Sequence, residues 1–440
     1  MKADSIKLLL LFFETCIGKP VMKELLIKNI KKLIQIEDEN IPFVSGSDMA
    51  HLPCIEDAYL WIKEDKIIRF GTMAEIDGEI FTPGVEVIDA TGKLVMPAWC
   101  DSHTHLVYPK SRDVEYVDKI KGLSYEEIAK RGGGILNSAK LMKKASEEQL
   151  FEDAMVRLAE ITKWGTGAVE IKSGYGLTTA TELKMLRVIK RLKKESPLTI
   201  KSTFLGAHSI PLAYRGKQKK YVDLVVTEML PAVAEEQLAD YVDVFCDVGF
   251  FTVDDTDRIL DAAARYGLAP KIHANELDYS GGIQIGVKYK AVSVDHLEFT
   301  GDEEIKALKD SGTMPTILPG AAFFLNMAYA PARKMMEAGL PVALASDFNP
   351  GSSPSGNMQL IMSMGSVLYR MLPEEVIHAV TKNTAYAMGV DQELGSICIG
   401  KKANVLITKE IPGIEYLPYA YGENKIETTI LNGEIVCQNK

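Results

Sequence analysis

Short apolar runs alternate with longer segments of helical period through the middle of this chain, and this alternation restricts the possible folds more than any other feature. We identify eight such runs, at residues 94–98, 167–171, 202–205, 242–246, 270–272, 291–294, 314–318 and 342–345. Strands that alternate with helices form a parallel sheet covered by those helices. Eight repeats predict an α/β fold of the TIM (β/α)8 barrel type, which usually needs about 250 residues.

The segments between the runs carry the signals of helix boundaries. Three pairs have the spacing of an N-terminal capping box, namely Ser146 with Gln149, Thr179 with Glu182, and Thr300 with Glu303. Three glycines follow helical segments at positions typical of a C-terminal cap, namely Gly165, Gly267 and Gly312. These signals support helices between the predicted barrel strands.

The two ends of the chain share a different pattern, in which short β-like runs are separated by Asp, Gly and Pro clusters. An Asn432-Gly433 pair, typical of a hairpin turn, joins the last two runs. We expect both ends to form one small β-sandwich domain. The expected divisions are an N-terminal extension of uncertain structure at 1–21, the first part of the β domain at 22–98, the barrel at 99–391, and the second part of the β domain at 392–440.

Composition excludes several classes of function. Sixty acidic and fifty basic residues give a net charge of -10 without a basic block, which disfavours a nucleic-acid partner. The six cysteines are far apart and form no C-x-x-C motif, which disfavours a disulfide framework and is typical of a reducing cytoplasm. The apolar stretch at 6–13 is interrupted by Lys7 and has no cleavage site, and no run of 18 apolar residues occurs. We therefore expect a cytoplasmic protein with no membrane partner.

Five of the seven histidines follow the apolar runs closely, together with two acidic residues. They are His103 and His105 after the first run, His208 after the third, His273 and Glu276 after the fifth, His296 after the sixth, and Asp347 after the eighth. Active sites of TIM barrels lie at the C-terminal ends of the strands. The sequence therefore predicts an active site on this rim, and it gives no role to His51 or His378.

The chemistry of this set favours a metal site. His103 and His105 are two residues apart, so a strand would place both rings on one face. Each residue alone has an ordinary structural explanation, such as a hydrogen-bonded imidazole at a strand end or an aspartate that caps a turn. Together, three imidazoles and one carboxylate suit zinc or iron, which would activate water for hydrolysis. Glu276 lies three residues after His273 and is well placed to move the proton of that water.

Longer motifs resemble the amidohydrolase superfamily. Its opening signature is similar to residues 94–97 followed by 101–105, and its closing signatures are similar to residues 381–385 and 395–404. Within the superfamily the chain resembles the imidazolonepropionases. The motifs that carry this resemblance are residues 105–112, 132–135, 170–177, 203–208, 273–276, 293–297, 318–320 and 346–352, in the family's order. Residues 108–110 depart from the Gly-rich form of the family but remove no functional residue.

The resemblance implies a role for each matching residue. It makes His103, His105, His273 and Asp347 the ligands of one divalent or trivalent metal ion, zinc or iron. It makes Glu276 the proton-handling acid, with His208, His296 and Asp347 as further catalytic residues. The implied substrate contacts are Arg112, Tyr125 and Tyr175 at the propionate, Asn349, Gly351 and Ser352 at the other end, and His208 and Glu276. An Arg guanidinium suits a carboxylate because it can donate two hydrogen bonds at once.

The implied activity is metal-dependent hydrolysis of the cyclic amide of 4-imidazolone-5-propanoate to N-formimidoyl-L-glutamate, in histidine degradation. The partners that the resemblance implies are this small anionic heterocycle and a second copy of the chain in a homodimer. Two alternatives stay open: another mononuclear amidohydrolase such as a deaminase, and an inactive scaffold. Binuclear relatives use a carboxylated lysine, but Lys172 lies in a motif of the mononuclear family.

Overall fold

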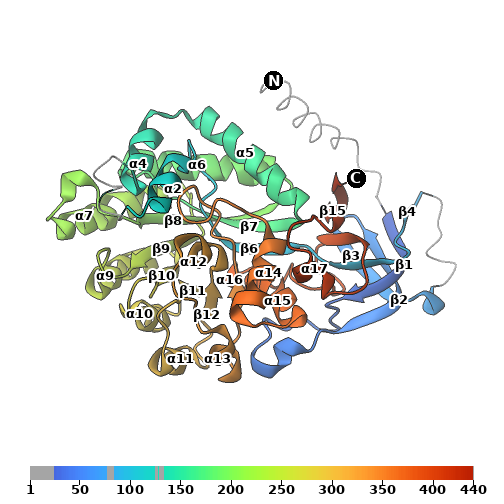
Figure 1. The fold of residues 1–440 in the computed structure, drawn as a ribbon. Helices are drawn as coiled ribbons and strands as arrows, with labels where there is room; N and C mark the ends of the chain where they lie inside the picture. The colour runs from blue at the N-terminus through green and yellow to red at the C-terminus, as the bar shows by residue number, and fades with distance from the viewer. Residues whose placement is uncertain (1–23, 77–83, 124–126, 128–132, 440) are drawn as a thin grey trace.

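The computed structural model describes residues 24–76, 84–123, 127 and 133–439 (Figure 1). The predicted extension at 1–21, Tyr125 and Gly132 lie outside the described residues. Within the described part, two sheets of eight strands each are joined by one chain. In Figure 1 the parallel sheet and its helices lie on the left, and the other sheet lies on the right.

The first sheet is built from both ends of the chain. Its strands are β1 (Glu24–Ile34), β2 (Cys54–Lys63), β3 (Lys66–Thr72), β4 (Glu86–Asp89), β5 (Lys93–Pro97), β14 (Val405–Glu410), β15 (Ile426–Leu431) and β16 (Glu434–Gln438). Strand β5 joins the strands of the two chain ends, because it pairs with β1 on one side and with β14 on the other. A separate apolar cluster that includes Leu60, Val95 and Ile430 fills this sheet's own core. The predicted union of the two chain ends in one β unit is confirmed.

The second sheet is the barrel. Its strands follow chain order and pair in parallel: β6 (Trp99–Thr104), β7 (Thr166–Lys172), β8 (Thr199–Ala207), β9 (Tyr241–Cys246), β10 (Ala269–Ala274), β11 (Ser293–His296), β12 (Met314–Ile317) and β13 (Ala343–Leu344). The two edges meet where Thr104 pairs with Phe348 and the His105 N–H donates to the Phe348 carbonyl at 2.9 Å. The predicted TIM barrel is confirmed.

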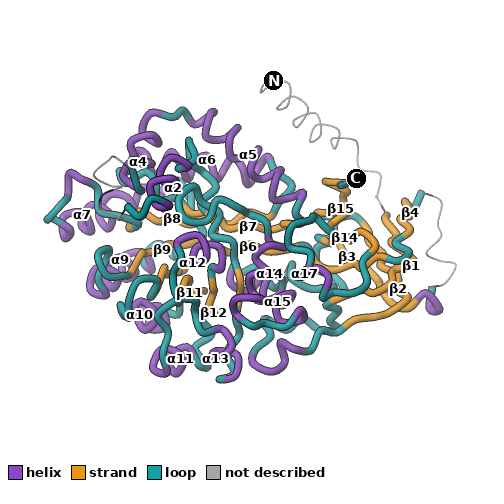
Figure 2. The backbone as a smooth tube through the Cα atoms, in the orientation of Figure 1, coloured by secondary structure: helices purple, strands orange, loops and turns teal. Residues whose placement is uncertain are grey.

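Helices surround the barrel strands (Figure 2). They are α2 (Asp113–Ile120), α4 (Ile135–Lys144), α5 (Glu147–Lys163), α6 (Thr179–Glu195), α7 (Gln218–Leu224), α8 (Leu230–Glu235), α9 (Val253–Ala264), α10 (Gly282–Lys288), α11 (Asp302–Leu308), α12 (Pro319–Leu325), α13 (Ala332–Glu337), α14 (Met358–Tyr369), α15 (Pro373–Val380) and α16 (Lys382–Ala387). A further short helix, α17 (Tyr416–Tyr419), packs on α14. No helix in the described ranges is long and apolar enough to cross a membrane.

One predicted strand differs from the structure. The run at 94–98 belongs to the end sheet as β5, and the first barrel strand is β6, which directly follows it. A search for apolar runs misses β6 because its inward side chains are polar. These side chains find partners inside the barrel, as when His103 contacts Asp295 and Thr104 donates to the Glu170 carbonyl.

Two helix starts are shifted by one residue from the predicted caps. Ser146 caps α5 as predicted and accepts the Gln149 N–H, but α6 is capped by Thr178 and α11 begins after Gly301. The reason at α6 is that Glu182 turns back into the preceding loop. There its carboxylate accepts the N–H groups of residues 174, 176 and 177.

Candidate active site

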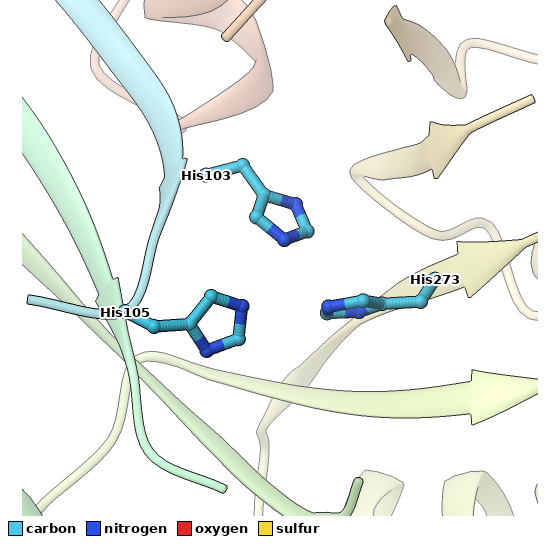
Figure 3. A group of neighbouring side chains, drawn as sticks. All are labelled: His103, His105 and His273. Atoms are coloured by element: carbon cyan, nitrogen blue, oxygen red, sulfur yellow. The ribbon is translucent and has the colours of Figure 1, made fainter. Parts of the chain in front are cut away.

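Three histidines converge inside the barrel at the C-terminal ends of its strands (Figure 3). His103 lies on β6, His105 is the first residue after the end of β6, and His273 lies on β10. One ring nitrogen from each lies within 4.8 Å of the others, and all three side chains are buried. Burial lowers the pKa of His103 and of His105 well below the usual range, so both rings are neutral, as a metal ligand must be.

Asp347 lies beside two of these histidines. Its Oδ1 atom lies 3.6 Å from Nε2 of His103 and 3.6 Å from Nε2 of His105. These separations are too long for hydrogen bonds but close to the edge of about 3.4 Å expected in a tetrahedron whose metal–ligand bonds are about 2.1 Å. Nε2 of His103 is also buried without a hydrogen-bond partner among the described residues. The residues present therefore fit a metal ion.

Two buried aspartates contact the opposite nitrogens of the histidine rings. His103 Nδ1 lies 2.6 Å from Asp295 Oδ2, and His273 Nδ1 lies 2.9 Å from Asp243 Oδ2. A carboxylate behind a ligating imidazole fixes which nitrogen carries hydrogen and leaves the other free for the metal. Sequence reasoning missed both aspartates because they lie within strands, where it expected apolar side chains.

Lys172 joins these two aspartates beneath the site. Its Nζ atom lies 2.8 Å from Asp243, 3.7 Å from Asp295 and 2.6 Å from Glu170, and all four side chains are fully buried. Burial alone lowers the pKa of Lys172, but the three carboxylates raise it above the ordinary value. The Lys172 amine is thus engaged by three carboxylates and is not the carboxylated lysine that binuclear relatives use.

Glu276 and two further histidines line the open side of the site. Glu276 Oε2 lies 3.7 Å from His296 Nε2, and the Glu276 N–H donates to Asp247 at 2.7 Å, which holds its loop. Burial, with the charges of Asp347 and Asp247, raises the pKa of Glu276 to about 8. The His208 ring stacks on His105 with centroids 5.2 Å apart.

The tautomer of His208 follows from its hydrogen bond. Its Nδ1 lies 3.1 Å from the Gly174 carbonyl oxygen, which only accepts, so Nδ1 carries the hydrogen. Burial lowers the pKa of His208 to about 3, so the ring is neutral. Nε2 of His208 is therefore a hydrogen-bond acceptor.

A cavity of about 690 Å³ opens onto this cluster. It is lined by the predicted residues His105, Arg112, Tyr175, His208, His273, Glu276, His296, Asp347, Asn349, Gly351 and Ser352. Phe245, Phe250 and Phe324 give it an apolar wall. Such a cavity suits a small flat molecule with a polar edge. Tyr125, the remaining predicted contact, lies outside the described residues.

Arg112 is less free than the sequence indicates. Its Nε donates to Glu115 Oε2 at 2.7 Å, and a terminal nitrogen lies 2.6 Å from the same oxygen. The guanidinium also lies against Gly351, where an added Cβ would come within 2.1 Å of it. Lys119 reaches the same place and donates to the Gly351 carbonyl at 3.0 Å. Lys119, which sequence reasoning missed, adds a second cation to this end of the cavity.

The loop at 347–352 is held by its own polar groups. Asn349 Oδ1 accepts the N–H groups of Gly351 and Ser352, and Asn349 Nδ2 donates to the Asp347 carbonyl at 2.7 Å. Asp347 itself has a left-handed backbone, with a φ of 51°. Asn349 therefore has a structural task in addition to any substrate contact, because it fixes the loop that presents the Asp347 carboxylate.

Comparison with known proteins places the chain in a family. Residues 127–437 match the model of the Amidohydrolase family. The imidazolonepropionase of Christiangramia forsetii is 54% identical over 94% of this chain and 100% of its own length. The chain belongs to the imidazolonepropionase family. A second member, from Flavobacterium johnsoniae, is 53% identical over 93% of this chain and 99% of its own length.

Several solved structures are similar to this chain in fold but not in sequence. The 5-methylcytosine deaminase of Klebsiella pneumoniae, liganded with phosphonocytosine, has a TM-score of 0.68 and is 18% identical, over 94% of this chain and 98% of that one. A triazine hydrolase from Arthobacter aurescens has a TM-score of 0.70 at 15% identity, over 95% of each chain. The barrel and end sheet of imidazolonepropionases are therefore an architecture shared with distant hydrolytic enzymes.

Proposed function

We propose that this chain hydrolyses the cyclic amide of 4-imidazolone-5-propanoate to N-formimidoyl-L-glutamate, the imidazolonepropionase step of histidine degradation. The observation that carries the proposal is the presence, in one cavity, of a three-histidine, one-aspartate site together with an arginine and a lysine. The histidine and aspartate site suits hydrolysis of an amide, and the two cations suit a carboxylate. Identity above 50% to relatives of that name supports the same substrate.

His103, His105, His273 and Asp347 would hold one metal ion, zinc or iron. When bound, the ion supplies Lewis-acid activation of a water and of the ring carbonyl. Glu276 accepts a proton from the attacking water and returns it to the ring nitrogen as the C–N bond breaks. Its burial supports this role, because a raised pKa lets the carboxyl both take up and release a proton near neutral pH.

The two histidines at the cavity wall take different tasks in this proposal. His208 carries its hydrogen on Nδ1, so its Nε2 accepts a hydrogen bond from a ring N–H of the substrate. His296 has Nε2 on the cavity side, beside Glu276, and stabilises the negative charge that develops on the ring oxygen. One well-placed donor to such an oxygen is worth about 3 kcal/mol.

Arg112, Lys119 and Tyr175 orient the propionate in this proposal. Replacing Arg112 with alanine is expected to raise KM more than it lowers kcat, because the guanidinium contacts a part of the substrate that does not react. Arg265→Ala, which removes an exposed arginine paired with Asp261, should leave both constants unchanged. Steady-state kinetics on the purified variants measure the difference. An unchanged KM in Arg112→Ala would contradict the substrate assignment.

We also propose a homodimer, as the family resemblance implies. Light scattering on the purified chain tests this: a mass of two chains supports it, and a mass of one chain contradicts it.

A further inference from the structure

Glu298 is a buried carboxyl group that the proposed mechanism does not use. Its side chain is fully shielded from solvent, and neither of its oxygens has a hydrogen-bond partner among the described residues. A buried polar group without a partner costs about 1–3 kcal/mol, so such a group calls for an explanation. Glu298 follows His296 by two residues in the loop after β11.

His296 lies between Glu298 and Glu276. On one side, Nε2 of His296 lies 3.7 Å from Glu276 Oε2 at the cavity. On the other side, Nδ1 is buried without a partner and lies 4.0 Å from Glu298 Oε2. That separation is longer than a hydrogen bond, so the Glu298 side chain has to rotate to close it. Nδ1 of His296 and the Glu298 carboxyl are thus neighbouring buried groups, each without a hydrogen-bond partner among the described residues.

The backbone that brings them together is strained and firmly held. His296 and Leu297 have φ values of 85° and 73°, in the left-handed region that non-glycine residues rarely adopt. Strain of this kind costs of order 1–3 kcal/mol per residue and is concentrated at functional sites. Backbone hydrogen bonds from Leu297 to Ala274 and from Phe299 to Asn275 hold the loop against the end of β10.

We propose that Glu298 is a positioning residue that donates a hydrogen bond to Nδ1 of His296 and so keeps the hydrogen of that ring on Nε2, facing the substrate. This inference rests on the proposed function, because it gives His296 the donor that the developing oxyanion needs. It assigns Glu298 no contact with substrate or metal.

The protonation states support this direction of the hydrogen bond. Burial, with the charge of Glu276 next in size, raises the pKa of Glu298 well above its usual range, so the carboxyl keeps its proton. A neutral imidazole that accepts at Nδ1 carries its only hydrogen on Nε2. Without Glu298, the ring is free to adopt the other tautomer and lose its donor.

Two substitutions distinguish a Glu298 that acts through a hydrogen bond from one that acts through a negative charge. Glu298→Leu removes the donor and is expected to lower kcat by about 10²-fold, with little change in KM, since an orienting group acts mainly on the transition state. Glu298→Gln keeps a donor in its amide N–H and is expected to retain most of the activity. If Glu298 acted through a negative charge, glutamine would fail as badly as leucine, and the proposal would be wrong. Because the glutamine amide can also accept a hydrogen bond, the direction of the bond is read from the ring tautomer of His296.

A double-mutant cycle with His296→Asn makes the test specific. Once His296 is absent, Glu298→Leu should cause no further loss of kcat, because the two residues act as one unit. The matched control is Glu304→Gln, a buried glutamate of α11 that accepts from Gly301 and Gln284, which should leave kcat unchanged in both backgrounds. Equal losses from Glu298→Leu with and without His296 would overturn the inference.

A second readout does not depend on turnover. The ¹⁵N shifts of His296 in the metal-loaded protein report which ring nitrogen carries hydrogen. We expect hydrogen on Nε2 in the native chain and in Glu298→Gln, and a shift toward Nδ1 in Glu298→Leu. Hydrogen on Nδ1 in the native chain contradicts the role of Glu298. A native chain with the expected tautomer but no hydrolysis contradicts the proposed function instead.

Discussion

Glu276→Gln is expected to lower kcat by about 10²–10⁴-fold while the metal site stays filled. Glutamine has the shape of glutamate but cannot accept the proton of the attacking water. The substitution should leave the loop in place, because Glu276 is anchored through its backbone N–H to Asp247 rather than through its carboxyl. Steady-state kinetics together with metal analysis of the same sample measure the effect.

The control for this variant lies two residues along the same loop. Asp278 is exposed, and its carboxylate accepts a local backbone N–H, from Tyr279. Asp278→Asn makes the same chemical change without touching the site, so kcat should stay at the native value. A Glu276→Gln enzyme that keeps kcat close to native would show that another group moves the proton.

Lys172→Met is expected to destabilise the protein by about 3–5 kcal/mol. The substitution removes the buried cation that Glu170, Asp243 and Asp295 share, although Glu170 keeps a second one in Lys271. Removing one partner of a buried charge network costs far more than removing an exposed ion pair, because the remaining charges cannot reach water. The midpoint of urea unfolding, measured at a fixed metal concentration, reports the change.

Lys334→Met is the matched control. Lys334 pairs with Asp302 at 2.7 Å, but its side chain is 53% exposed and that of Asp302 is 89% exposed. Exposed pairs contribute only about 0–1 kcal/mol, so the unfolding midpoint should hardly move. If both variants shifted the midpoint equally, the buried ion pairs of Lys172 would contribute no more to the free energy of unfolding than an exposed ion pair does.

The rim of the barrel could be predicted from the sequence because its residues follow apolar runs along the chain. His208, His273, His296 and Asp347 come within three residues of the ends of predicted strands, and strand polarity places such residues on one rim. The barrel followed from the alternation of apolar runs with helical segments, and the union of the chain ends followed from the short β-like runs that both ends share. In these cases, the order of residue types along a short stretch of sequence is enough to predict where the residues lie in the fold.

The polar interior could not be predicted in the same way. Glu170, Lys172, Asp243, Lys271 and Asp295 lie within strands, where a charged residue normally argues against burial. Each is stable there only because residues from distant strands neutralise it, and a single sequence does not show which residues meet. The contact of Glu115 with Arg112 and the loop-holding role of Asn349 are local in sequence, but they depend on side-chain and loop conformations that became visible only in the structure.

One reaction tests the proposed function most directly. Purified protein should consume 4-imidazolone-5-propanoate, followed as loss of its absorbance, with about one zinc or iron ion bound per chain. A chelator should abolish turnover, and added metal should restore it. Absence of turnover by protein whose metal site is fully occupied would contradict the proposed function directly.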